Sequence, residues 1–179
     1  IDGAVRTLAG ELCACGKLCE CRCACRNGAA RQSTSNTPWG IAVRVDGWVF
    51  ISELYGHRVR SISPTGMVAV LAGSGVEGYA DGVGAYASFK NPAGLKLGPD
   101  GYLYLADLGN HCVRRVNPST GHVATVAGRP IVGAADGRLE ECLFDCPRDV
   151  ALTSCGRFIF VADSQNCRIR MLDMHQRTV

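Results

Sequence analysis

The sequence predicts an all-β fold made of repeated, four-stranded antiparallel units. Residues 91–128 contain four short apolar or alternating stretches separated by turn sequences such as Pro99-Asp100-Gly101. The same cassette returns after about 54 residues, which indicates a repeat architecture. The 22 glycines and 7 prolines among 179 residues suit a chain rich in turns.

The cassette at 91–128 predicts each of its strands in turn. Its first stretch alternates apolar and polar side chains and leads through the Pro-Asp-Gly turn into a more apolar second stretch, which predicts a hairpin. The turn Asp107-Leu108-Gly109-Asn110 and a second turn over 117–121 lead into two further strands. Strands joined by short turns form an antiparallel meander. We expect them at residues 94–97, 102–106, 112–116 and 122–126.

The repeats divide the chain into blades and connectors. Residues 38–73 match the cassette position for position, and residues 147–179 match it a third time with one extra residue in the second strand. The connectors also share a spacing of Asp-Gly, Phe and Pro. The expected organisation is the last strand of a preceding blade at 1–10, a cysteine-rich insertion and connector at 11–37, a blade at 38–73, a connector at 74–91, a blade at 92–128, a connector at 129–146 and an incomplete blade at 147–179.

The repeat resembles the NHL-repeat family of β-propellers. The resemblance is carried by the Asp-Gly turn and the Leu-Tyr-x-Ala-Asp run within residues 100–107, by Asn110 and Arg114 after it, and by the closing Ala127-Gly128. It implies an NHL-type β-propeller or partial propeller with four-stranded antiparallel blades and a Cys-rich loop insertion. The family includes interaction modules, RNA-binding domains, sensors and a lyase acting on amidated peptides, so the fold does not select a function.

Three blades and a leading strand are fewer than the roughly six blades that the resemblance implies. An open arc exposes sheet faces and edge strands that favour pairing with something else. The chain is therefore expected to be part of a longer propeller, half of a ring closed by a second copy, or an arc in a larger assembly. Its expected partners are other protein chains or further copies of itself.

Charge and hydropathy exclude some partners. The net charge is only +3, with 20% charged residues, which is too small an electrostatic footprint for a dedicated nucleic-acid binder. No run approaches the eighteen apolar residues that a membrane-spanning helix needs. We therefore expect neither a nucleic-acid partner nor a membrane span.

Residues 11–26 are the one segment foreign to the repeat, and their cysteines all fall at odd positions, which share one face of an extended strand. A hairpin there would allow disulfides. Thiolates packed this closely could instead bind zinc or copper. The cysteine density favours an extracellular or other oxidising compartment. The cysteines of this segment are Cys13, Cys15, Cys19, Cys21, Cys23 and Cys25.

Three cysteines outside that segment are further disulfide candidates. Cys142 and Cys146 lie four residues apart, where one helical turn would bring them together, and a bond to Cys155 would pin the connector to its own blade. The chain has 11 cysteines, so at least one thiol is free, binds a metal or pairs outside the chain.

A recurrent arginine in the third strand of each blade has two interpretations. A basic ladder along several blades could bind an acidic peptide, a carboxylate or a phosphate. Alternatively, each arginine pairs with the acid that recurs at the end of the second strand, which explains the periodicity without a ligand. The arginines are Arg60, Arg114 and Arg170, with Arg58 and Arg168 two residues earlier on the same face, and the acids are Glu53, Asp107 and Asp163.

One tryptophan and one repeated histidine position also have two interpretations each. Trp39 stands where the other blades have Ala93 and Arg148, and it is either buried packing or a partner-binding aromatic. His57, His111 and Cys167 share one repeat position, which provides either turn polarity or metal ligands that converge near the ring axis.

No stretch resembles a nucleophile elbow, a zinc-protease motif or a phosphate loop. The sequence thus predicts a non-catalytic structural or protein-interaction propeller module without a cofactor, within a larger propeller or assembly. One alternative is a lyase or hydrolase whose active site is completed by missing blades. Another is a Cys-rich metal or redox sensor.

Overall fold

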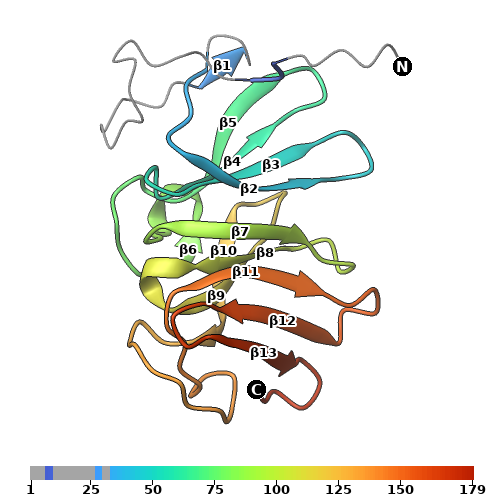
Figure 1. Cartoon of the computed structure of the whole chain (residues 1–179). Coiled ribbons are helices and arrows are strands. Elements are labelled where there is room, and N and C mark those ends of the chain that lie inside the picture. The colour runs from blue at the N-terminus through green and yellow to red at the C-terminus, as the bar shows by residue number, and fades with distance from the viewer. Residues whose placement is uncertain (1–6, 10–26, 30–32) are drawn as a thin grey trace.

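The computed structural model describes residues 7–9, 27–29 and 33–179. Within them the chain forms three antiparallel sheets that follow one another along the molecule (Figure 1). We call them the first, second and third blade. Most of the expected strand at 1–10, and all six cysteines between 13 and 25, lie outside the described residues.

The first two blades have the same strand order, and the third repeats its inner part. Neighbouring strands in sequence are neighbours in each sheet, apart from one short added strand. This is the meander that the turn sequences predict, and the all-β class is confirmed. The first blade contains β2 (Pro38–Val43), β3 (Val49–Glu53), β4 (Arg58–Ile62) and β5 (Met67–Ala72); the second contains β7 (Pro92–Leu97), β8 (Leu103–Asp107), β9 (Cys112–Val116) and β10 (His122–Gly128); the third contains β11 (Pro147–Leu152), β12 (Phe158–Asp163) and β13 (Arg168–Asp173).

The connectors contribute short strands of their own, which the sequence analysis did not expect. β1 (Gly28–Ala29) pairs with β5, and β6 (Gly82–Val83) pairs with β10, so both sheets have five strands. In the third blade the Val179 N–H donates to the Gly137 carbonyl at 2.8 Å, which repeats this contact with the preceding connector. Each connector therefore closes the outer edge of the blade that follows it.

The strands β2, β7 and β11 lie side by side at the inner edges of the blades (Figure 1). Glycine makes this approach possible. A Cβ atom on Gly40 would lie 2.6 Å from the Ala93 carbonyl oxygen, and one on Gly94 would lie 2.6 Å from the Asp149 Cα. The Ser52 hydroxyl also donates to the Ala93 carbonyl at 2.5 Å, joining the first blade to the second.

Most of the hydrophobic core lies between the blades, and a small separate cluster of Ile62 and Val68 on the first blade packs against Ala9. One cluster fills the first interface and another fills the second. Two connector phenylalanines, Phe89 and Phe144, are fully buried, one in each cluster. Ala87 and Cys142 occupy the same connector position in the two clusters and are likewise buried. The connectors are thus part of the packing that joins one blade to the next.

Candidate functional site

The recurrent arginine of the second blade lies at the centre of a buried polar network. Arg114 is fully buried and donates to Asp107 Oδ2 at 2.9 Å, to Asp81 Oδ1 at 2.7 Å and to the Ala80 carbonyl at 2.7 Å. Asp107 also accepts from Asn110 Nδ2 and from the Lys90 N–H, each at 2.8 Å. The network ties strands β8 and β9 to the connector before them.

Burial and charge act in opposite directions on this pair. Burial raises the pKa of Asp107 to about 6, although the Arg114 charge and the donated hydrogen bonds act to lower it. Burial acts to lower the pKa of Arg114, but the charges of Asp107 and its neighbours raise it overall. Burying the carboxylate charge of Asp107 would be costly without the guanidinium of Arg114 beside it. Removing either group would leave the other as an unpaired buried charge.

The other two blades repeat the pair. Arg60 lies 3.2 Å from Glu53, and Arg170 lies 3.0 Å from Asp163, with all four side chains at least 96% buried. The structure therefore corrects the expected binding role of Arg60, Arg114 and Arg170, because guanidiniums enclosed by their own carboxylates and connector carbonyls cannot reach a ligand.

Arg58 and Arg168 do not extend this network into a basic ladder. Arg58 Nη2 lies 3.5 Å from the Ser74 carbonyl, and Arg168 Nη1 lies 3.3 Å from the Ala134 carbonyl. Arg58 thus reaches the connector that follows its blade, and Arg168 reaches the connector that precedes its blade. Arg168 is exposed, and Arg58 is half-buried. The five arginines thus separate into three buried structural groups and two that lie nearer the surface.

The structure corrects the disulfide expectation for Cys142, Cys146 and Cys155, which are free thiols. Cys142 is buried in the core, where its Sγ lies 3.3 Å from the Leu139 carbonyl and burial raises the pKa of its thiol to about 11. Cys155 lies in an exposed turn, and the Thr153 hydroxyl beside it lowers the pKa of its thiol. The three belong to different environments. The zinc, copper or disulfide alternatives for the 13–25 cysteines fall outside the described residues.

His57, His111 and Cys167 do not converge. All three take the left-handed conformation, with φ of 51°, 53° and 53°, in the turn that precedes the third strand. His57 Nδ1 accepts from the Asn91 N–H at 3.2 Å, and His111 Nδ1 accepts from the Cys146 N–H at 3.1 Å. Each histidine therefore joins its own blade to the start of the next inner strand.

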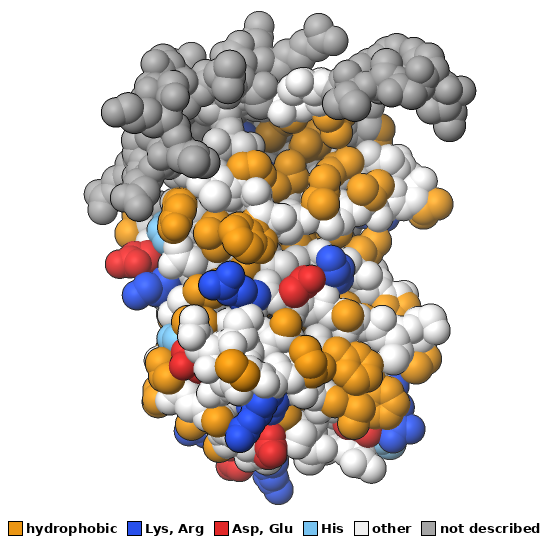
Figure 2. Space-filling view, in the orientation of Figure 1, with side chains coloured by type: hydrophobic (Ala, Val, Ile, Leu, Met, Phe, Trp, Pro, Cys, Tyr) orange, Lys and Arg blue, Asp and Glu red, His pale blue; other side chains and the backbone are white. Residues whose placement is uncertain are grey.

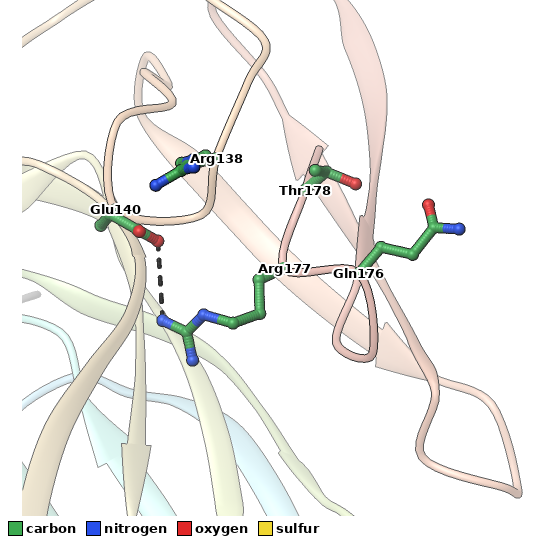
Figure 3. Close-up of a pocket in the computed structure, with 5 residues that line it drawn as sticks. All are labelled: Arg138, Glu140, Gln176, Arg177 and Thr178. Atoms are coloured by element: carbon green, nitrogen blue, oxygen red, sulfur yellow. Dashed lines mark ion pairs between the residues drawn. The ribbon is translucent and has the colours of Figure 1, made fainter.

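The surface of the described residues is hollowed beside the end of the third blade and between the second and third blades. The larger hollow, of about 470 Å³, is lined by polar and charged side chains, and Arg177 lies 3.5 Å from Glu140 across it (Figure 3). The smaller, of about 300 Å³, lies between the turns of the second and third blades. There the Tyr104 hydroxyl donates to Asp100 Oδ2 at 2.8 Å, and burial raises the pKa of Tyr104 to about 12. Among the candidate residues, Cys155 lines this smaller hollow.

Exposed apolar side chains mark the two outer blades. Trp39 is 51% exposed, which excludes the buried-packing alternative for this residue. On strand β2 it alternates with buried residues and shares its face with Ile41 and Val43. Figure 2 shows hydrophobic side chains gathered over the first blade and again near the ends of β12 and β13.

The apolar residues on the third blade form a face that the sequence analysis missed. We call Phe160, Ile169 and Met171 the third-blade face; they are 37%, 73% and 48% exposed. Phe160 and Ile169 stand at the repeat positions of Tyr104 and Val113, which are 5% and 0% exposed. Laying the repeats on one another would have placed these apolar side chains at positions of one blade face, but only the structure shows that the face is uncovered.

The repeats are similar in sequence to known proteins. The chain is 33% identical over 161 residues to the Arabidopsis thaliana protein SUPPRESSOR OF QUENCHING 1, chloroplastic, covering 84% of this chain and 15% of that protein. It is 29% identical over 155 residues to NHL repeat-containing protein 2 of Bos taurus, covering 79% of this chain and 21% of that protein. The chain thus spans about a fifth or less of the length of these relatives. A scan with protein-family models found no match.

Solved structures agree on the fold. An auxiliary nutrient binding protein from Bacteroides thetaiotaomicron superposes with a TM-score of 0.69 at 25% identity, over 78% of this chain and 38% of that one. Virginiamycin B lyase from Staphylococcus aureus superposes with a TM-score of 0.53 at 14% identity, over 80% of this chain and 43% of that one, and shows the fold alone. The described blades are those of a β-propeller. The chain belongs to the NHL-repeat family.

The described residues contain no helix long and apolar enough to cross a membrane.

Proposed function

We propose that this chain is a non-catalytic protein-interaction module of the NHL type, and that its third-blade face binds a further blade of the same type within a larger propeller or assembly. The supporting observation is the contrast between equivalent positions. In the first blade, Phe50 and Val59 are 1% and 0% exposed because the second blade packs over them. Their third-blade counterparts, Phe160 and Ile169, are exposed.

The first blade offers the opposite contact surface, which Ala9 covers in part beside Ile62 and Val68. Ile41 is 59% exposed, whereas Leu95 and Val150, at the same repeat position, are 0% and 1% exposed. Both of these pack against the blade before them. Each blade thus has one face for the preceding blade and one for the following blade. Burying a large apolar side chain contributes about 1.5–3 kcal/mol, so covering these faces favours a completed ring or assembly.

The position of Asp149 constrains the completing blade. It occupies the inner-strand position of Gly40 and Gly94, and its carboxylate is 53% exposed and lies 3.8 Å from Lys96 Nζ. A blade that packs against β11 therefore has to accommodate or pair this carboxylate. A partner with a basic or small residue opposite Asp149 fits this surface.

Sedimentation of the full chain tests the proposal. We expect association that increases with chain concentration, and we expect Ile169→Glu to abolish it, because a carboxylate in a covered apolar face is not solvated. Val83→Glu is the matched control, since Val83 is 48% exposed on β6, outside both faces. A chain that stays monomeric at high concentration and binds no isolated NHL blade through this face would contradict the proposal.

The structural neighbours include both a binding protein and a lyase, so the fold leaves catalysis to be tested. The lyase or hydrolase alternative requires an active site completed by further blades. The sensor alternative requires a role for the 13–25 cysteines. An oxidising or extracellular location stays a prediction, and the free cysteines among the described residues give it no support.

A further inference from the structure

The interface between the second and third blades brings three metal-binding side chains together. His111 comes from the turn between β8 and β9, while Asp145 and Cys146 immediately precede β11. Their candidate ligand atoms all lie within 4.8 Å of one another, and His111 Nδ1 lies 3.6 Å from Asp145 Oδ1. All three residues are partly buried, so the cluster is sheltered but open to solvent ions.

The same backbone arrangement exists at the interface between the first and second blades, with other side chains. Lys90 N and Asp145 N each donate at 2.8 Å to the acid of their own blade. Asn91 and Cys146 have φ of 53° and 48°, and each donates its N–H to the histidine of the blade before. The histidine hydrogen bond is therefore part of the repeat. The carboxylate and the thiol are specific to the second interface.

We propose that His111, Asp145 and Cys146 form a zinc site that bridges the second and third blades. Imidazole, thiolate and carboxylate are all zinc ligands, and a set that mixes sulfur, nitrogen and oxygen suits a borderline-soft ion better than Ca²⁺ or Mg²⁺. In a tetrahedral site with bonds of 2.0–2.3 Å, ligand atoms are separated by roughly 3.3–3.8 Å. Small side-chain rotations bring this cluster to that spacing.

Binding would have defined chemical consequences. The Cys146 thiol loses its proton to solvent when its sulfur binds the ion. His111 binds the ion through one of its ring nitrogens. If Nδ1 is the ligand, it gives up the hydrogen bond that it accepts from the Cys146 N–H; if the ring rotates so that Nε2 is the ligand, Nε2 binds the ion instead. Three protein ligands leave the fourth tetrahedral position for water or for a ligand atom from a partner. This inference does not depend on the proposed packing of the third-blade face.

The test uses the full chain with the cysteines at 13, 15, 19, 21, 23 and 25 replaced by serine, so that they cannot supply ligands. We expect one Zn²⁺ per chain after dialysis against a weak competing chelator, measured by elemental analysis. Co²⁺ should give the spectrum of a tetrahedral ion with one thiolate. Cys146→Ser should remove the thiolate charge-transfer band and weaken zinc binding at least about 100-fold, since even indirect supporting groups contribute 10–100-fold.

Matched variants separate ligation from folding. His111→Gln should weaken zinc binding as Cys146→Ser does, while His57→Gln removes the equivalent hydrogen bond at the first interface and should leave zinc binding unchanged. Lys90→Asp combined with Asn91→Cys copies the cluster to that interface and should add a second Zn²⁺. Circular dichroism of each variant checks that it is folded. Absence of zinc from the parent chain, or zinc binding that survives Cys146→Ser, would overturn the proposal.

Discussion

At the scale of single residues, the buried ion pairs explain the most regular polar feature of the sequence. Arg114 and Asp107 are both fully buried, and each hydrogen bond of the pair joins elements within or next to the second blade. Asp81 also contacts Arg114, but its side chain is 52% exposed. The periodic arginines therefore stabilise the fold. Of the two acids beside Arg114, the buried Asp107 is expected to contribute more stability than the exposed Asp81.

Removing the buried acid should cost far more stability than removing the exposed one. We expect Asp107→Asn to lower the free energy of unfolding by about 3–5 kcal/mol, because it leaves the Arg114 charge buried without its main partner. Asp81→Asn should lower it by about 1 kcal/mol or less, because water replaces the lost carboxylate. Urea unfolding of the two variants checks this. Equal losses would mean that the connector contact, and not the buried pair, holds the strands.

At the scale of elements, the close approach of the inner strands determines how the blades pack. A Cβ atom on Gly94 would collide with Asp149, and one on Gly40 would lie 2.6 Å from the backbone atoms on either side of Gly94, so neither position has space for a side chain. The adjacent connectors then place Phe89 and Phe144 in the two cores. A blade is thus stabilised mainly by its neighbours, as in other repeat proteins.

Adding a methyl group at Gly94 should separate the inner strands. We expect Gly94→Ala to lower the free energy of unfolding by about 1–3 kcal/mol, the usual cost of overpacking a tight core. Asp149→Ala is the control on the facing strand, since it removes atoms from a half-exposed side chain and should change stability by about 0.5 kcal/mol or less. Thermal unfolding of both variants measures the difference. A neutral Gly94→Ala would show that β7 and β11 can move apart freely.

At the scale of the whole molecule, the two outer blades expose different faces. Ile41 belongs to the face that packs on a preceding blade, and Ile169 belongs to the face that packs on a following one. Contacts of this kind are heterologous, joining unlike surfaces, and they close into rings when the rotation permits. The proposed zinc site of His111, Asp145 and Cys146 lies at an interface inside the chain, away from both faces.

Mixing two variants tests whether the outer faces are complementary. Ile41→Glu and Ile169→Glu each block one face, so each variant alone should be monomeric. Their mixture retains one intact face of each kind and should form a dimer that cannot grow further. Analytical ultracentrifugation of the mixture distinguishes the cases. Association of either variant alone would show that like faces pair, which the repeat geometry does not predict.

The blade and the order of its strands along the chain follow from the sequence alone. Turn residues such as Asp100-Gly101 and the alternation of apolar side chains act over a few neighbours, and the repeat multiplies the signal three times, so the meander and the Arg114–Asp107 pairing could be anticipated locally. Which faces are covered follows only from the packing of the blades, because exposure at Trp39 or Ile169 depends on whether another blade lies over it. The tertiary structure also brought His111 to Asp145 and Cys146, which are 34 and 35 residues away in sequence, because that contact arises only when one blade packs against the next.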